Sequence, residues 1–228
     1  MDTGGWVELW LSAPRFAPYL AEANADRAAA LDYYVWNARV AASFLHDLGH
    51  LEVALRNAYD RTLTAGDPPG APHWVYAPKR HLPVAMKRDS KTGDMYDSNE
   101  SARKAITKAV KEARKDSKVS TPDPGKVIAE INFGFWRYLT ANRLHGLWVR
   151  RLSHAFPAGT RQKDVDARVG RLHTLRNRAA HHEPLLRANL PARYRDLLEV
   201  AGMLSDPLAA HIDAHSVTLD LIEQRPTG

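Results

Sequence analysis

The strongest constraint on the fold is a run of apolar residues from Asp26 to Tyr59 that repeats with the period of an α-helix. The repeating positions are Leu31, Tyr34, Val35, Ala38, Ala42, Leu45, Leu48, Leu51, Leu55 and Tyr59. Because successive helical residues turn by about 100°, this spacing gathers them on one side of a helix. The run therefore predicts one long helix, or two that meet at a bend near Gly49.

The rest of the chain predicts further helices around a loop-rich middle. Helices are expected over residues 12–22, 98–118, 164–182, 190–204 and 207–221, with two more in the apolar stretch 125–156. Glycine and proline interrupt this pattern after residue 65, so about 66–100 is expected to be an irregular insertion. Within it, Trp74 and Tyr76 are expected to pin the loop onto the core, with base stacking as the alternative. No alternating pattern predicts a strand pair, and the expected fold class is all-α.

The absence of cysteine in 228 residues removes several chemistries at once. Disulfides, zinc–thiolate sites, iron–sulfur clusters and a cysteine nucleophile are excluded, which fits a reducing, cytoplasmic location. The sequence begins without a basic stretch leading into apolar residues, so no signal peptide is expected. No run of about 18 apolar residues occurs, and no membrane partner is expected.

Positive charge is concentrated in two stretches of a chain whose formal net charge is +6. Residues 79–118 hold twelve basic and six acidic side chains, and residues 150–178 hold eight basic and two acidic ones. A nucleic-acid backbone is the natural partner for this distribution, although a solvated lysine face is the alternative for residues 103–118. The candidate RNA-binding residues are Arg171, Arg178, Lys104, Lys108 and Lys111.

The segment from Leu175 to Leu185 combines an arginine, an amide and two imidazoles just before Pro184, which must end the helix. In a regular helix Arg176 falls on the apolar side, so its guanidinium needs a carboxylate, backbone carbonyls or a bound anion. Arg176 and His181 diverge by more than a right angle. Either the last turn is distorted near Pro184 or a second subunit completes the site.

Arg176-Asn177, three further residues and His181-His182 resemble the R-x4-6-H signature of HEPN domains, in the form found in Abi-like abortive-infection proteins. Tyr34–Asn37, Glu52–Asn57 and Phe133–Trp136 resemble other segments of that group. The resemblance implies a single HEPN-like helical bundle over residues 1–228. Members of that family are usually dimers and often metal-independent RNases, so the resemblance implies these properties here as well. It also implies a role in bacterial phage defence and a possible neutralising antitoxin partner.

The chemistry of these side chains suits RNA cleavage. RNA carries its own nucleophile, the 2′-hydroxyl, so cleavage needs a base, an acid and a positive charge on the phosphate. Arg176 is expected to bind the phosphate, His181 or His182 to transfer protons, and Asn177 to orient one of these groups. No metal and no cofactor is expected. The alternative is a noncatalytic RNA-binding or antitoxin-like module.

Two further groupings of polar residues leave alternatives open. Glu52 and Arg56, four residues apart, either pair with each other at the surface, or Glu52 receives Arg176 in the core and fixes its orientation. His211 and His215 share the same spacing of four, but with Asp213 they give only a weak cation site. His145 and His154 are expected to be ordinary helix residues.

Overall fold

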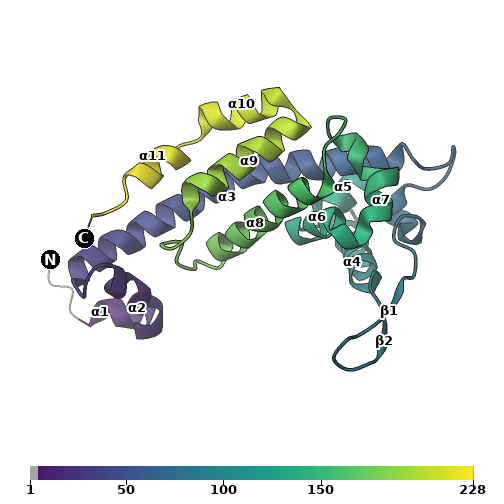
Figure 1. Cartoon of the computed structure of the whole chain (residues 1–228). Coiled ribbons are helices and arrows are strands. Elements are labelled where there is room, and N and C mark those ends of the chain that lie inside the picture. Colours follow the sequence, from purple (N-terminus) through teal and green to yellow (C-terminus); the bar gives the residue numbers. More distant parts are fainter. Residues whose placement is uncertain (1–4, 228) are drawn as a thin grey trace. The chain divides into compact units, whose positions relative to one another are not determined.

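The computed structural model describes residues 5–227 and is built almost entirely of helices (Figure 1). The α-helices are α1 (Trp6–Leu11), α2 (Ala13–Glu22), α3 (Arg27–Thr64), α4 (Glu100–Ser117), α5 (Pro124–Ala129), α6 (Phe133–Thr140), α7 (His145–Arg150), α8 (Gln162–Ala180), α9 (Leu190–Leu204), α10 (Asp206–His215) and α11 (Thr218–Glu223). Short 3₁₀ turns are η1 (Trp74–Tyr76), η2 (Pro78–Arg80), η3 (Asn142–Leu144) and η4 (Leu152–Ala155). The all-α prediction is confirmed.

Helix α3 is continuous over 38 residues, so the run forms one helix and is not broken at Gly49. A glycine inside a helix costs about 1 kcal/mol relative to alanine. The apolar side continues through that point, because Leu48, Leu51 and Leu55 are all buried. Burial of these side chains outweighs the conformational cost of one glycine.

The chain divides into two compact units, and the divisions fall inside α3 and α8. The first unit joins Met1–Leu51 with Arg168–Gly228, and the second is Glu52–Ala167. The first unit contains α9, which packs against α10 and α11. Within this unit the Trp36 indole donates to the carbonyl of Leu221 at 2.7 Å.

The second unit has an aromatic core that includes the predicted loop anchor. Trp74 is buried, its indole donates to Asp60 Oδ1 at 2.7 Å, and its ring stacks on Phe135 with centroids 6.3 Å apart. Trp74 therefore pins the loop and is not available to stack on bases. The stretch expected to hold two helices contains three, since Asn132 caps α6 by accepting from the amide of Phe135 and Ala141 is extended after it.

Three further differences from the sequence predictions concern the two ends of the chain and the insertion. Helix α1 precedes the first expected helix, and the expected final helix is two, α10 and α11. An antiparallel hairpin joins β1 (Met86–Arg88) to β2 (Met95–Asp97). No residue of either strand is buried, so the alternation that normally marks a strand has no reason to appear in the sequence.

Candidate functional site

The helix that carries the Arg-Asn and His-His pairs, α8, ends in a Schellman motif rather than a regular turn. The amide of His182 donates to the carbonyl of Ala179 at 3.1 Å, and that of Glu183 donates to Arg178 at 2.8 Å. His182 takes the left-handed position with φ 54°, where glycine is usual. The chain thus leaves the helix at His182, just before Pro184, while the amide of His181 keeps the regular helical hydrogen bond to the carbonyl of Asn177 at 3.0 Å. The left-handed conformation costs about 1 kcal/mol for a residue other than glycine.

Arg176 lies in the final turns of α8 and is partly buried. Within residues 5–227, its guanidinium makes no hydrogen bond or ion pair. The carboxylate or carbonyl partner expected for an inward arginine is therefore not supplied within its own unit. A partly buried guanidinium that lacks a protein partner is well suited to bind an anion, because its fork matches two phosphate oxygens.

Asn177 contacts an imidazole that the sequence analysis did not single out, His173. The Asn177 Nδ2 to His173 Nε2 distance is 3.2 Å. Because an amide NH₂ only donates, His173 Nε2 accepts here and its proton resides on Nδ1. On a regular helix His173 lies about 60° from Arg176 and about 40° from Asn177. A search for imidazoles three or four residues before Arg176 and Asn177 would have found it.

His181 and His182 follow the last residue of α8, and both are exposed. His181 lies about 140° around the helix axis from Arg176 but only about 40° from Asn177. The sequence-predicted residues are therefore brought together only in part. Asn177 lies between two imidazoles, His173 and His181, while Arg176 shares its face with His173.

The predicted RNA-binding arginines of α8 both have protein partners. Arg171 donates from Nε to Asp196 Oδ2 at 2.8 Å and from Nη2 to Oδ1 at 2.5 Å, and this carboxylate raises the pKa of Arg171. Arg178 donates to the carbonyl of Pro184 and lies 3.5 Å from Glu183 Oε2. Arg171 ties α8 to α9, and Arg178 ties the end of α8 to the turn that follows.

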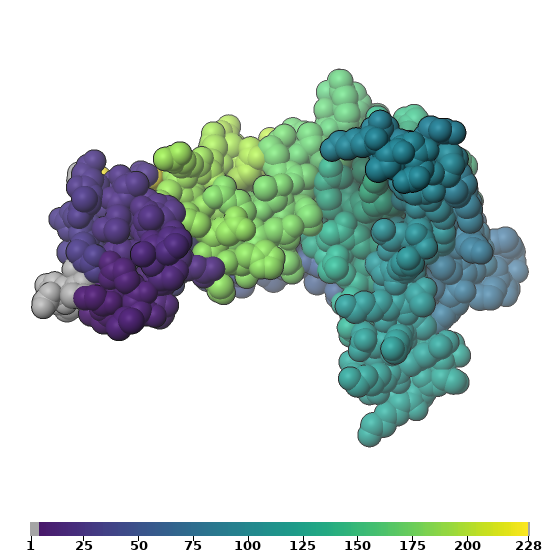
Figure 2. Space-filling model, turned by 90° about the horizontal axis from the view of Figure 1, so that it is seen from below, coloured from purple at the N-terminus to yellow at the C-terminus, as the bar shows by residue number. Residues whose placement is uncertain are grey.

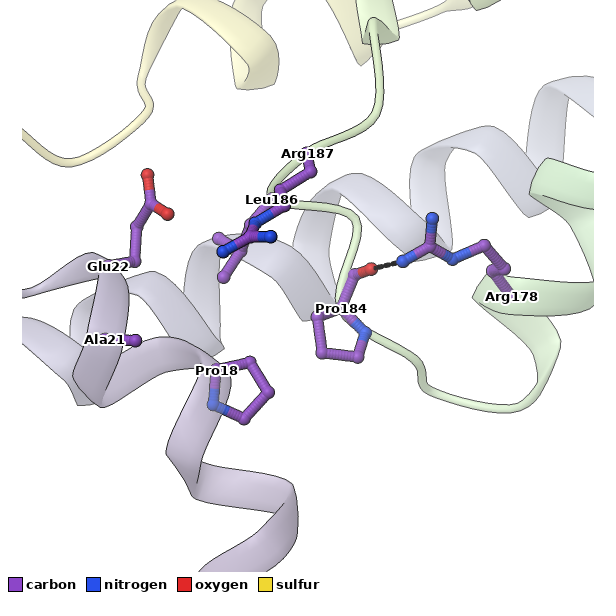
Figure 3. Close-up of a pocket in the computed structure, with 7 residues that line it drawn as sticks. All are labelled: Pro18, Ala21, Glu22, Arg178, Pro184, Leu186 and Arg187. Atoms are coloured by element: carbon purple, nitrogen blue, oxygen red, sulfur yellow. Dashed lines mark hydrogen bonds between the residues drawn. The ribbon is translucent and has the colours of Figure 1, made fainter.

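Two hollows flank Arg178 at the surface of the first unit. One, of about 370 Å³, is shown in Figure 3 with Arg178 donating to Pro184, and α2 and the loop after α8 supply the other walls. Its remaining lining residues are Pro18, Ala21, Glu22, Leu186 and Arg187. The other, of about 300 Å³, is lined by Arg171, Thr174, Leu175, Arg178, Ala188, Asn189 and Arg193. In the space-filling view this part of the chain, in light green, reaches the surface next to the purple N-terminal helices (Figure 2).

The three predicted lysines lie on α4, in the second unit. Lys104, Lys108 and Lys111 are exposed, and Lys104 Nζ is 2.9 Å from Glu100 Oε1. The opposite side of the helix is buried through apolar residues such as Ala102 and Ile106. The lysines thus form a solvated basic face on a helix that is anchored from its other side.

Glu52 and Arg56 begin the part of α3 that belongs to the second unit. Both side chains are partly buried, and Arg56 Nε is buried with no hydrogen-bond partner among the described residues. The proposed pairing of Glu52 with Arg176 joins residues of different units and stays a prediction.

In comparisons with known proteins, no family model, no curated protein and no solved structure matches the chain. Across residues 5–227, no helix combines the length and the apolar character needed to cross a membrane. Function is therefore inferred from the side chains at the end of α8.

Proposed function

We propose that this protein is a metal-independent endoribonuclease of a bacterial abortive-infection or toxin-type defence system, with its site at the end of α8. The observation that carries the proposal is Arg176, a partly buried arginine that no described residue pairs. It shares a helix face with the His173–Asn177 contact and precedes two exposed imidazoles. Guanidinium and imidazole are the groups that RNA cleavage without a metal requires.

In the proposed reaction the 2′-hydroxyl oxygen of RNA attacks the adjacent phosphorus, and the bond from phosphorus to the 5′-oxygen breaks. One imidazole accepts the proton of the 2′-hydroxyl, and another donates a proton to the departing 5′-oxygen. Arg176 stabilises the negative charge that builds on the phosphorane oxygens. The products are a 2′,3′-cyclic phosphate and a 5′-hydroxyl end.

Three imidazoles are candidates for the two proton transfers. His181 and His182 are exposed at the end of the helix, and His173 shares the face of Arg176. Since His181 lies about 140° from Arg176 on its own helix, a homodimer in which a second copy contributes an imidazole would also satisfy the chemistry. Cytoplasmic RNA as substrate and a neutralising antitoxin partner belong to the same proposal through the resemblance to Abi-like proteins.

The test is cleavage of a labelled RNA by the purified protein in excess EDTA, compared with the same oligonucleotide carrying 2′-deoxyribose at the cleaved position. We expect cleavage of the RNA alone, with a cyclic phosphate on the 5′ fragment. Arg176→Ala should abolish cleavage, whereas Arg195→Ala should not, because Arg195 is an exposed arginine of α9 outside the proposed site. Strict dependence on Mg²⁺, or cleavage by Arg176→Ala at the wild-type rate, would refute the mechanism.

The second candidate is a noncatalytic RNA-binding or antitoxin-like module of the HEPN type. The exposed lysine face of α4 favours it, since such a face binds phosphates without any catalytic group. Binding of RNA by the wild-type protein without cleavage would support this reading. Each of Lys104→Ala, Lys108→Ala and Lys111→Ala should then lower the slope of log affinity against log salt by about 1.

A further inference from the structure

Four imidazoles from two distant parts of the sequence contact one another on the first unit. His46 and His50 belong to α3, and His211 and His215 belong to α10. The ring centroids are 5.0 Å apart for His46 and His50, 5.5 Å for His50 and His211, and 4.4 Å for His211 and His215. From sequence only the pair on α10 could be recognised, because no local pattern places α3 beside it.

Neighbouring rings of this cluster lie at about the separation that two imidazole ligands of one metal ion have. Zinc binds an imidazole nitrogen at about 2.0–2.1 Å, so the ring centroids of two ligands in a tetrahedral site lie roughly 5 Å apart. Each neighbouring pair of the cluster is close to that value. Two histidines four residues apart on a helix face also form a recognised zinc-binding arrangement.

The outer histidines of the cluster are held in the manner of metal ligands. His46 Nδ1 lies 2.9 Å from Asp47 Oδ1. Asp47 is 1% exposed, and its other oxygen accepts from the hydroxyls of Ser216 and Thr218. His215 Nδ1 lies 2.8 Å from the carbonyl of His211. A carboxylate and a carbonyl only accept, so in its neutral form each ring carries its proton on Nδ1. Each therefore presents the Nε2 lone pair, the pattern typical of histidines that bind zinc.

The carboxylate that the sequence offered as a ligand is engaged elsewhere. Asp213 Oδ1 accepts from the hydroxyl of Tyr194 at 2.9 Å. Among residues 5–227, no three histidine, aspartate or glutamate side chains already converge on one point as ligands. His211 and His215 are exposed, so their rings can turn about χ1 and χ2 to bring nitrogen atoms onto a common ion.

We propose that His50 and His211, with His46 or His215, bind a divalent ion of the imidazole-preferring class, and that Zn²⁺ is the ion to test. The ion would link α3 to α10, and the histidine side chains would rotate to bring their nitrogen atoms onto it. Magnesium is not expected there, because it prefers oxygen ligands.

This site is separate from the proposed ribonuclease site and does not depend on it. The turn after α8 contacts α3 at Asn37, whose Oδ1 accepts from the amide of Leu185 at 2.6 Å. His46 lies nine residues further along α3, which is about 13 Å at the helical rise. Zinc at the imidazole cluster is thus a binding or stabilising feature and not a participant in RNA cleavage.

The experiment is titration of the purified, metal-free protein with ZnCl₂ in a calorimeter, with native mass spectrometry to count bound ions. We expect one tight site per chain and no binding of MgCl₂. The double variant His50→Ala/His211→Ala should bind zinc at least about tenfold more weakly, since ligand loss should exceed the loss of a supporting group. His154→Ala is the matched control and should bind as the wild type does, because His154 is an exposed histidine of the second unit.

Two results would overturn the inference. One is the same zinc affinity in the double variant as in the wild type. The other is loss of zinc binding in His181→Ala but not in the double variant, which would place the ion at the end of α8. Circular dichroism of the double variant before titration confirms that it is folded. Neither outcome bears on RNA cleavage, so this inference and the proposed function can fail separately.

Discussion

Two arginines of α8, five residues apart, are treated differently by the same structure. Arg171 forms two hydrogen bonds with the carboxylate of Asp196, which is 7% exposed, and so links α8 to α9. Arg176 is partly buried and has no partner among the described residues. An arginine whose guanidinium is hydrogen-bonded to a carboxylate of the protein has a structural role. An arginine that shares the helix but lacks a partner is the one available to a ligand.

The largest expected effect is on catalysis, in Arg176→Ala. Removal of the group that stabilises the developing charge should lower the rate of RNA cleavage by about 100-fold or more. The free energy of unfolding should change by less than about 0.5 kcal/mol, because no protein partner is left unpaired. Single-turnover cleavage and urea unfolding measure the two quantities. A large loss of stability with little loss of cleavage would reverse the comparison between the two arginines.

A second, similar effect is expected in the pH dependence of cleavage. If two of the three imidazoles act as base and acid, the rate should follow a bell-shaped curve, and each essential histidine contributes one limb. Replacement by alanine of a histidine that transfers a proton, tested in turn for His173, His181 and His182, should lower the rate by about 100-fold and remove one limb. A variant that is slower but keeps both limbs would show that its imidazole only positions other groups.

The third effect is on stability, in Arg171→Ala. Asp196 would lose two charge-assisted hydrogen bonds and, among residues 5–227, keep Arg193 as its one charged partner, with Nη2 3.3 Å away. Because the Arg171 side chain is 41% exposed, water screens the pair, and we expect a loss of about 1–2 kcal/mol. Urea unfolding measures it, with Arg195→Ala as the control. Cleavage should persist, and its loss would make Arg171 part of the site.

The helices could be predicted from sequence wherever a buried apolar face sets the period. Helices α3, α8 and α9 all have such a face, and proline and asparagine mark where α9 begins. The hairpin of β1 and β2 has no buried face, so its sequence shows no alternation of apolar and polar residues. The break between α10 and α11 depends on Asp47, a residue 169 positions before Ser216, and a local pattern cannot report such a contact.

The candidate site could be predicted as a list of residues but not as an arrangement. Arg176, Asn177, His181 and His182 follow from residue type and spacing. Asp196 of α9 pairs with Arg171 and not with Arg176. This choice depends on how α9 packs against α8, and a local sequence pattern does not report such packing. His173 contacts Asn177 from one turn back along the helix, outside the stretch from Leu175 to Leu185 on which the prediction was based.

The smallest effect separates the two adjacent histidines. His182 occupies a left-handed position that glycine adopts without strain, so His182→Gly should raise the free energy of unfolding by about 0.5–1 kcal/mol. The hydrogen bonds that end α8 involve only the backbone of residue 182, so the helix end should keep its shape.

Because His182→Gly is expected to stay folded, its cleavage activity shows whether the His182 imidazole transfers a proton. Activity equal to that of the wild type would assign proton transfer to His181 or His173, with His182 retained for the shape of the turn. A stable but inactive His182→Gly would mean that the strained conformation exists to present the His182 ring, and that Arg176 works with an imidazole six residues further along the chain. Urea unfolding and single-turnover cleavage of this one variant therefore test both the conformational cost and the chemical role.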